Sequence, residues 1–157
     1  MFYDVFFEKL YHNNVKYLLI GGYAVNIYGV NRATCDIDIL VDLSPENIDN
    51  LLNVLKSIDM IPQLPVNIED IKSEKIRNQW TKEKNLIAFS FYKKNEPYHA
   101  VDVFLKQLAN FEELFHNRKI IKYNDVEIYV ISKEDLIKLK SISGRKKDNL
   151  DIEELKK

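Results

Sequence analysis

The chain has 157 residues, of which 46% are hydrophobic and 11% aromatic, and this size and composition predict one globular domain over residues 1–157. Its 23 Lys and Arg residues nearly balance 24 Asp and Glu residues, so the overall charge supports neither a dedicated nucleic-acid-binding protein nor a membrane-surface protein. The single cysteine, Cys35, excludes an internal disulfide, and we expect it to be a small buried packing residue.

The N-terminal residues include acids and amides where a signal peptide would have a basic start and an unbroken apolar run. No later segment is long enough to span a bilayer. We therefore expect a cytoplasmic protein without a membrane partner.

The first part of the chain alternates helices with short strands. Apolar spacing and capping residues predict helices over residues 2–13, 23–28 and 45–58. Apolar runs predict strands over residues 15–20 and 35–41. Ser44 is expected to cap the third helix with its hydroxyl, and Gly29 is expected to end the second one.

The second part begins with a loop that Pro62 and Pro65 mark. Helices are then predicted over residues 67–80, 111–117, 133–143 and 149–155, and Ser132 is expected to cap the helix over residues 133–143. Strands are predicted over residues 86–92, 99–105, 120–123 and 126–131, and they pair as two hairpins. Together these elements predict an α/β (α+β) fold with a small mixed β-sheet flanked by helices on one side.

Gly21 and Gly22 stand where the first strand meets the next helix. Because glycine has no side chain, backbone amides at such a turn can approach a phosphate. Asp36 and Asp38 lie two residues apart on the next strand, so their carboxylates share one face and need a cation between them. The alternative interpretations are an ordinary strand-to-helix turn and strand-edge acids that face solvent.

A third acid, Asp102, interrupts a strand that is otherwise apolar. If this strand lies beside the one that carries Asp36 and Asp38, the three carboxylates form an oxygen-rich cluster suited to Mg²⁺, with two ions bridging. Such a site activates an attacking oxygen and stabilises a leaving pyrophosphate, while the glycine turn holds a triphosphate. The pattern therefore predicts nucleotidyl transfer, with these three acids as the catalytic and metal-binding residues.

The segment from Gly21 to Asp38 resembles the nucleotidyltransferase superfamily typified by DNA polymerase β. The residues that carry the likeness are Gly21, Gly22, Tyr23, Ala24, Tyr28, Gly29, Arg32, Thr34, Asp36, Ile37 and Asp38. A narrower likeness is to small prokaryotic nucleotidyltransferases of toxin-antitoxin and abortive-infection systems, which share this pattern. Those proteins end in Asp-Leu-Ile-x-Leu-Lys, matched at residues 135–140, and in Arg-x-x-Asp, matched at residues 145–148.

The resemblance implies an enzyme that moves an NMP from an NTP to an acceptor with Mg²⁺. Gly21 and Gly22 take the place of the family's phosphate-binding turn, and Lys140 falls where the family has a nucleotide-phosphate lysine. The implied acceptor is a tRNA end or a protein side chain, and an antitoxin protein is the implied partner. Two alternatives stay open: an antibiotic-type enzyme acting on a small hydroxyl compound, and a non-catalytic nucleotide- or partner-binding module of the same fold.

For several polar residues, the sequence allows both a structural and a functional role. Arg32 and Thr34 either fix the loop before the acidic strand, or Arg32 reaches a phosphate and Thr34 orients the carboxylates. Basic residues concentrate between positions 138 and 147, and such runs are usually solvated helix faces. Within this run we expect Lys140 to neutralise the triphosphate, and Arg145 to pair with Asp148 and tie the last two helices together.

Overall fold

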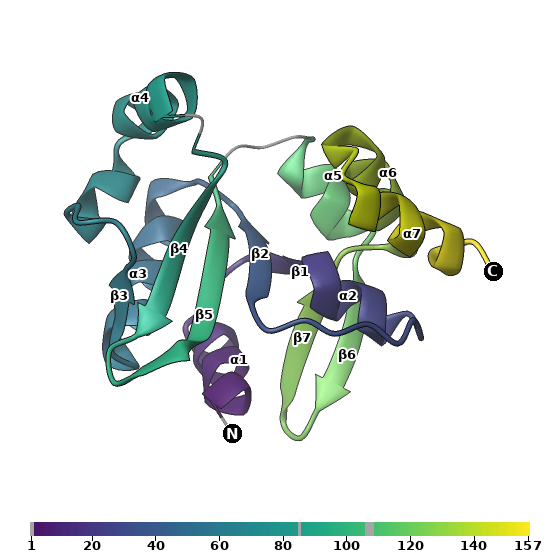
Figure 1. Ribbon diagram of the computed structural model, residues 1–157. Helices are drawn as coiled ribbons and strands as arrows, with labels where there is room; N and C mark the ends of the chain where they lie inside the picture. Colours follow the sequence, from purple (N-terminus) through teal and green to yellow (C-terminus); the bar gives the residue numbers. More distant parts are fainter. Residues whose placement is uncertain (1, 85, 106–108) are drawn as a thin grey trace.

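The protein is described by a computed structural model that covers residues 2–84, 86–105 and 109–157 (Figure 1). Its strands form one seven-stranded sheet in the order β3-β4-β5-β2-β1-β7-β6. They are β1 (Tyr17–Ile20), β2 (Ile37–Val41), β3 (Met60–Pro62), β4 (Ala88–Lys93), β5 (Glu96–Phe104), β6 (Lys119–Tyr123) and β7 (Val126–Val130). The helices are α1 (Phe2–His12), α2 (Gly21–Ile27), α3 (Pro45–Ser57), the 3-10 helix η1 (Ile68–Lys72), α4 (Glu74–Lys84), α5 (Phe111–His116), α6 (Lys133–Ser143) and α7 (Lys146–Leu155). The predicted mixed sheet flanked by helices is confirmed.

Strand β2 lies at the centre of the sheet and carries Asp38. It pairs antiparallel with β1 and parallel with β5, and the parallel register sets Asp38 directly beside Asp102. The alternating residues Ile37 and Ile39 are buried on the other face. The two acidic strands are therefore neighbours, which is the arrangement that a shared carboxylate cluster requires.

The two faces of the sheet have different covers. Helices α1 and α3 contact each other, and their buried side chains, such as Phe6 and Leu51, belong to the hydrophobic core. Helix α6 instead borders the face that carries Asp38 and Asp102, because Leu136 and Leu139 line a cavity together with both acids. The helices are not confined to one side of the sheet, in contrast to the prediction, because α6 forms a wall above its polar face.

Several element boundaries differ from the prediction, and three of the differences have a local cause. Pro62 belongs to β3, and because β3 is an edge strand the missing N–H of proline breaks no pairing on the open side. The helix predicted over residues 67–80 is divided at Ser73 into η1 and α4, each with its own polar cap, at Asn67 and Ser73. Helix α7 begins at Lys146, three residues earlier than expected, directly after Gly144 ends α6 at a φ of 63°.

Predicted caps and turns have mixed outcomes. The Ser132 hydroxyl accepts a hydrogen bond from the Asp135 amide, so the predicted cap of α6 is confirmed. The Ser44 hydroxyl donates to Asp42 instead of capping α3. Cys35 is exposed, contrary to the expected burial, because β2 begins only at Ile37. Among the described residues, no helix combines the length and apolar character needed to cross a membrane.

Candidate functional site

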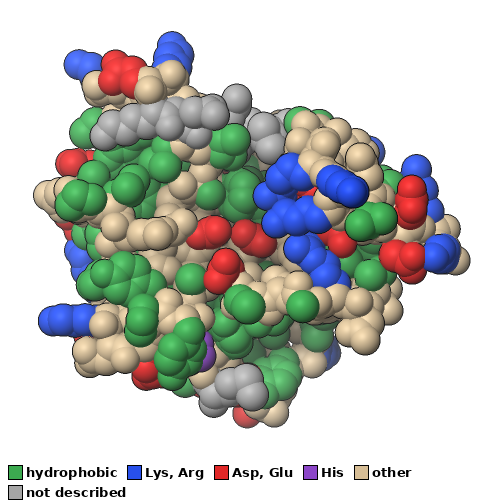
Figure 2. All heavy atoms as spheres, in the orientation of Figure 1, with side chains coloured by type: hydrophobic (Ala, Val, Ile, Leu, Met, Phe, Trp, Pro, Cys, Tyr) green, Lys and Arg blue, Asp and Glu red, His purple; other side chains and the backbone are tan. Residues whose placement is uncertain are grey.

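A cavity of about 660 Å³ opens above the polar face of the sheet, between strands β2 and β5 and helices α6 and α7. Figure 2 shows acidic side chains at the centre of this face and a cluster of Lys and Arg on the α6–α7 side. The cavity is lined by every residue that the sequence predicted for the site: Gly21, Gly22, Arg32, Thr34, Asp36, Asp38, Asp102 and Lys140. The structure thus gathers residues from both halves of the chain in one place.

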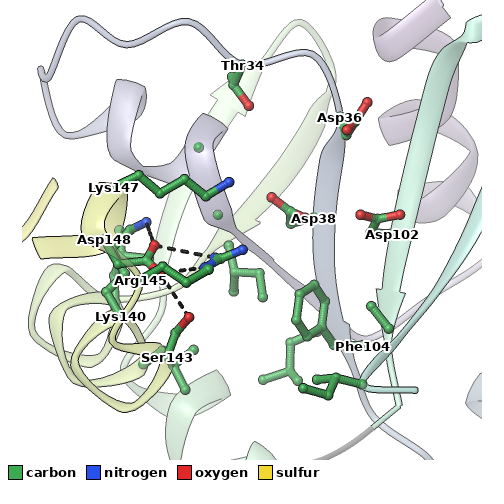
Figure 3. Close-up of a pocket in the computed structure, with 18 of the residues that line it drawn as sticks. Thr34, Asp36, Asp38, Asp102, Phe104, Lys140, Ser143, Arg145, Lys147 and Asp148 are labelled. Carbon is green, nitrogen blue, oxygen red and sulfur yellow. Dashed lines mark hydrogen bonds and ion pairs between the residues drawn. The ribbon is translucent and has the colours of Figure 1, made fainter. Parts of the chain in front are cut away.

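Asp38 lies beside Asp102 and below Asp36, and it is the acid of the three nearest to Arg145 and Lys147 in Figure 3. Burial and the negative charges of Asp102 and Asp36 raise the pKa of Asp38 to about 6, against the opposing effects of a hydrogen bond from the Gly22 amide and the positive charge of Arg145. The three acids are therefore close enough to repel one another. A bound cation would relieve this repulsion.

The double glycine is required by the close approach of the chain's own side chains. Gly21 has a φ of 67°, and a Cβ atom at this position would lie only 1.8 Å from Oδ2 of Asp38. A Cβ at Gly22 would lie 2.4 Å from Oγ1 of Thr34. The sequence predicts that the missing side chains let a phosphate approach, and in the structure they also make room for Asp38 and Thr34.

The acidic group has the donor chemistry of a magnesium site. Carboxylate oxygens are preferred ligands of Mg²⁺, and burial, followed by the charges of Asp102 and Asp36, raises the pKa of Asp38. As the side chains lie, no group of three or more His, Cys, Asp or Glu residues in the described part of the chain is arranged to enclose a metal ion. Asp36, Asp38 and Asp102 therefore suit a Mg²⁺ ion by their chemistry and by their closeness to one another.

Lys140 is held by two acids of helix α7. Its ammonium donates to Asp151 at 2.7 Å and to Asp148 at 3.2 Å, and only 6% of its side chain is exposed. Arg32 donates to the same oxygen of Asp151 at 2.8 Å. Two of the cations predicted for phosphate binding are thus already paired with carboxylates, so the loop before β2 is fixed to the C-terminal helix.

Asp148 is the second buried acid of this network. Burial alone would raise the pKa of Asp148, but hydrogen bonds from Arg145, Ser143 and Lys140 outweigh it and hold the pKa at about 2. The Nε atom of Arg145 donates to Asp148 at 2.7 Å, which confirms the predicted ion pair. Asp148 therefore remains charged at neutral pH and anchors Lys140 and Arg145 on one wall of the cavity.

Arg145 and Lys147 are the exposed cations of the cavity. The Arg145 side chain is 61% exposed, Lys147 is exposed as well, and both reach from the α7 side toward Asp38 (Figure 3). Neither residue was predicted from the sequence to belong to the nucleotide site. The sequence feature that could have identified them is the run at residues 145–148, in which three cations directly precede Asp148, an acid that is buried in helix α7.

Residues 4–156 match the model of a protein family described as "Nucleotidyltransferase of unknown function (DUF6036)". A search of curated proteins found no match. The structure is similar to that of lincomycin-bound LnuA, a lincosamide antibiotic adenylyltransferase, with a TM-score of 0.61 and 21% identity over 99% of this chain and 93% of that chain. It is also similar to an antigenic nucleotidyltransferase-like protein from Paracoccidioides brasiliensis, with a TM-score of 0.57 and 20% identity over 94% of this chain and 69% of that chain.

At identities of 21% and 20%, the similarity to these two solved structures shows a shared fold alone. The family match spans nearly the whole chain and agrees with the mixed sheet and with the acids beside the glycine turn. The chain belongs to the nucleotidyltransferase family described as DUF6036.

Proposed function

We propose that this nucleotidyltransferase uses Mg²⁺ to transfer an NMP from an NTP to an acceptor hydroxyl and releases pyrophosphate. The observation that carries the proposal is the pairing of Asp38 with Asp102 at the floor of a cavity whose opposite wall carries Arg145 and Lys147. An acidic floor and a basic wall are what a metal-bound triphosphate requires. We include a cytoplasmic location and a single-domain organisation over residues 1–157 in the proposal.

Each wall has a separate task in this reaction. Asp36, Asp38 and Asp102 would hold two Mg²⁺ ions, which when bound supply positive charge to the reacting phosphate oxygens. Arg145 and Lys147 bind the β- and γ-phosphates, while Lys140 and Arg32 support this wall through Asp151. Gly21 and Gly22 let Asp38 approach the turn, and Thr34 packs against that turn and fixes the loop before β2.

The chemical step is an in-line displacement at the α-phosphorus. The acceptor oxygen forms a bond to the α-phosphorus, and the bond from that phosphorus to the oxygen bridging the α- and β-phosphates breaks. Asp102 takes the proton of the acceptor hydroxyl, and pyrophosphate leaves toward Arg145 and Lys147.

Several acceptors follow from the likenesses. The toxin-antitoxin likeness of the sequence favours a tRNA end or a protein side chain, together with an antitoxin protein as partner. The fold shared with a lincosamide antibiotic adenylyltransferase favours a small hydroxyl compound. A module that binds a nucleotide without turnover is the competing non-enzymatic function, and the basic and acidic walls alone would also suit it.

The test is transfer of label from each α-labelled NTP into a cell extract with Mg²⁺. Wild type is expected to label an acceptor, and the Asp36→Ala/Asp38→Ala variant is expected to label none. Asp125→Asn is the matched control, because Asp125 lies in the β6–β7 turn and does not line the cavity. Nucleotide binding by wild type without any label transfer would favour the non-catalytic module.

A further inference from the structure

A second cavity adjoins the first one across the acidic group. It has a volume of about 420 Å³ and shares Asp36 and Asp102 with the larger cavity. The other residues that line it are Gln63, Ser90, Phe91, Tyr92, Pro97 and Ala100. The acids therefore form the boundary between two spaces, of which only the larger one has the basic wall.

The register of the sheet explains this arrangement. Asp38 pairs with Asp102 across β2 and β5, and Asp102 pairs with Ser90 across β5 and β4. Side chains at paired positions lie on the same face of a sheet, about 5 Å apart. Ser90 is thus the next side chain along the row that contains the two acids, and Tyr92 and Ala100 form the next pair.

The two cavities differ in their basic residues, although acids line both of them. The larger cavity is lined by Arg32, Lys140, Arg145 and Lys147, whereas the described residues that line the smaller cavity include no Lys or Arg. Figure 2 shows blue side chains on the α6–α7 side of the acids and mainly green and tan surface directly on their other side, with further charged side chains at the left margin.

This asymmetry bears on the acceptor. The 3′ end of an RNA carries phosphates along its backbone, and proteins bind such phosphates with Lys and Arg. In the smaller cavity, no Lys or Arg among the described lining residues could pair with those phosphates. A volume of about 420 Å³ lies within the range of small-molecule sites, and Gln63 and Ser90 offer uncharged hydrogen-bonding groups.

We propose that the smaller cavity is the acceptor site and that the acceptor is a small hydroxyl compound without phosphate. This inference rests on the proposed nucleotidyl transfer. Gln63 and Ser90 hydrogen-bond the polar groups of the compound, and Tyr92 packs against its body. The reacting hydroxyl lies at Asp102, which takes its proton as the oxygen bonds to the α-phosphorus and pyrophosphate leaves into the larger cavity.

The experiment fills the smaller cavity and follows where the label goes. Wild type, Ala100→Phe and Gln63→Trp are incubated with an α-labelled NTP, Mg²⁺ and cell extract, and the label is counted in the small-molecule, RNA and protein fractions. Calorimetry measures NTP binding by each variant, and thermal unfolding confirms that each is folded. Asn95→Phe, in the β4–β5 turn outside both cavities, is the matched control.

We expect wild type to label the small-molecule fraction. Each cavity-filling variant should reduce that label at least about tenfold, which corresponds to about 1.4 kcal/mol, because the added ring takes the space of the acceptor, while the NTP dissociation constant stays unchanged. Gln63 is exposed at the rim, so Gln63→Trp keeps the test valid even if Ala100→Phe does not fold.

Three results would overturn the inference. Label in RNA or protein would place the acceptor in another class and leave the proposed reaction intact. If both cavity-filling variants label the small-molecule fraction as strongly as wild type, the acceptor binds outside this cavity. Absence of label in every fraction, with or without NTP binding, would overturn the proposed nucleotidyl transfer itself.

Discussion

At the scale of single residues, glycine at position 21 is explained by one carboxylate. The space that a Cβ atom would occupy is filled by Asp38, so the backbone and the acid depend on each other. Gly29 offers a comparison, because it also has a positive φ, of 93°, but a Cβ there would meet no atom within 4 Å. A comparison of the two glycines therefore distinguishes the effect of a left-handed backbone from the effect of contact with Asp38.

We predict different outcomes for Gly21→Ala and Gly29→Ala. Both substitutions should lower the free energy of unfolding by about 1–2 kcal/mol, because alanine disfavours the left-handed region. Only Gly21→Ala should also displace Asp38, so nucleotidyl transfer should fall at least about a hundredfold in this variant, in line with misplacement of a reacting group. Chemical denaturation and label transfer measure the two effects. Equal activity in the two variants would contradict the account of Gly21.

A second prediction concerns the pH dependence of stability at Asp148. The folded-state pKa of about 2 lies below the ordinary value of 3.8, so this acid stabilises the fold above about pH 4 and loses that contribution as the pH falls toward 2. The contribution amounts to about 2 kcal/mol. In urea unfolding between pH 2 and pH 5, Asp148→Asn should lack this part of the wild-type slope. Parallel curves for the two proteins would show that the carboxylate is not stabilised in the fold.

At the scale of elements, the central feature is the junction of α6 and α7. Asp148 and Asp151 lie three positions apart on α7, so they share one face of the helix and meet the same lysine of α6. This arrangement makes Lys140 part of the structural frame, while the more exposed Lys147 is free to meet a substrate. It also connects Arg32, and with it the loop before β2, to the C-terminal helix.

We therefore predict that Lys140→Ala and Lys147→Ala have separable effects. Removing Lys140 leaves two buried carboxylates without their shared cation and should lower the free energy of unfolding by about 3–5 kcal/mol. Removing Lys147 should change stability by less than about 0.5 kcal/mol and should weaken NTP binding instead. Denaturation curves and calorimetry distinguish the two variants. A Lys140→Ala protein that is as stable as wild type but binds NTP more weakly would show that Lys140 binds the phosphates of the NTP.

The predictability of the fold and site differs from element to element. Local patterns predicted the hairpin turn at Asn124 and the capping serine before α6, because turn and cap chemistry is encoded within a few residues. The pairing of β2 with β5 could be stated only as a condition, since parallel strands that are distant in sequence leave no local signal. The acids that hold Lys140 were missed because a charge pattern does not show which partner a buried cation meets.

At the scale of the whole molecule, the polar face of the sheet is divided by charge. Acids from β2 and β5 occupy its centre, cations from α6 and α7 lie on one side, and uncharged residues of β4 and β5 lie on the other (Figure 2). This order suits a reaction in which a triphosphate enters from one side and an acceptor from the other. The nearly neutral net charge of the chain thus conceals a strongly polarised site.

We predict that Mg²⁺ stabilises the folded protein. A cation bound to the native state relieves the repulsion that raises the pKa of Asp38, and binding to the native state alone raises the melting temperature. Thermal unfolding with and without Mg²⁺ should show this rise in wild type and in Asp125→Asn, and none in Asp38→Asn/Asp102→Asn. A rise of equal size in the double variant would place the bound ion elsewhere.

Release of pyrophosphate is the measurement that tests the central claim most directly. Wild type supplied with an NTP, Mg²⁺ and cell extract should release pyrophosphate in step with transfer of the α-phosphate to an acceptor. Asp38→Asn and Asp102→Asn should each lower both rates at least about a thousandfold while the proteins remain folded. Pyrophosphate release by either variant at the wild-type rate would contradict the assignment of these two neighbouring carboxylates as the catalytic centre.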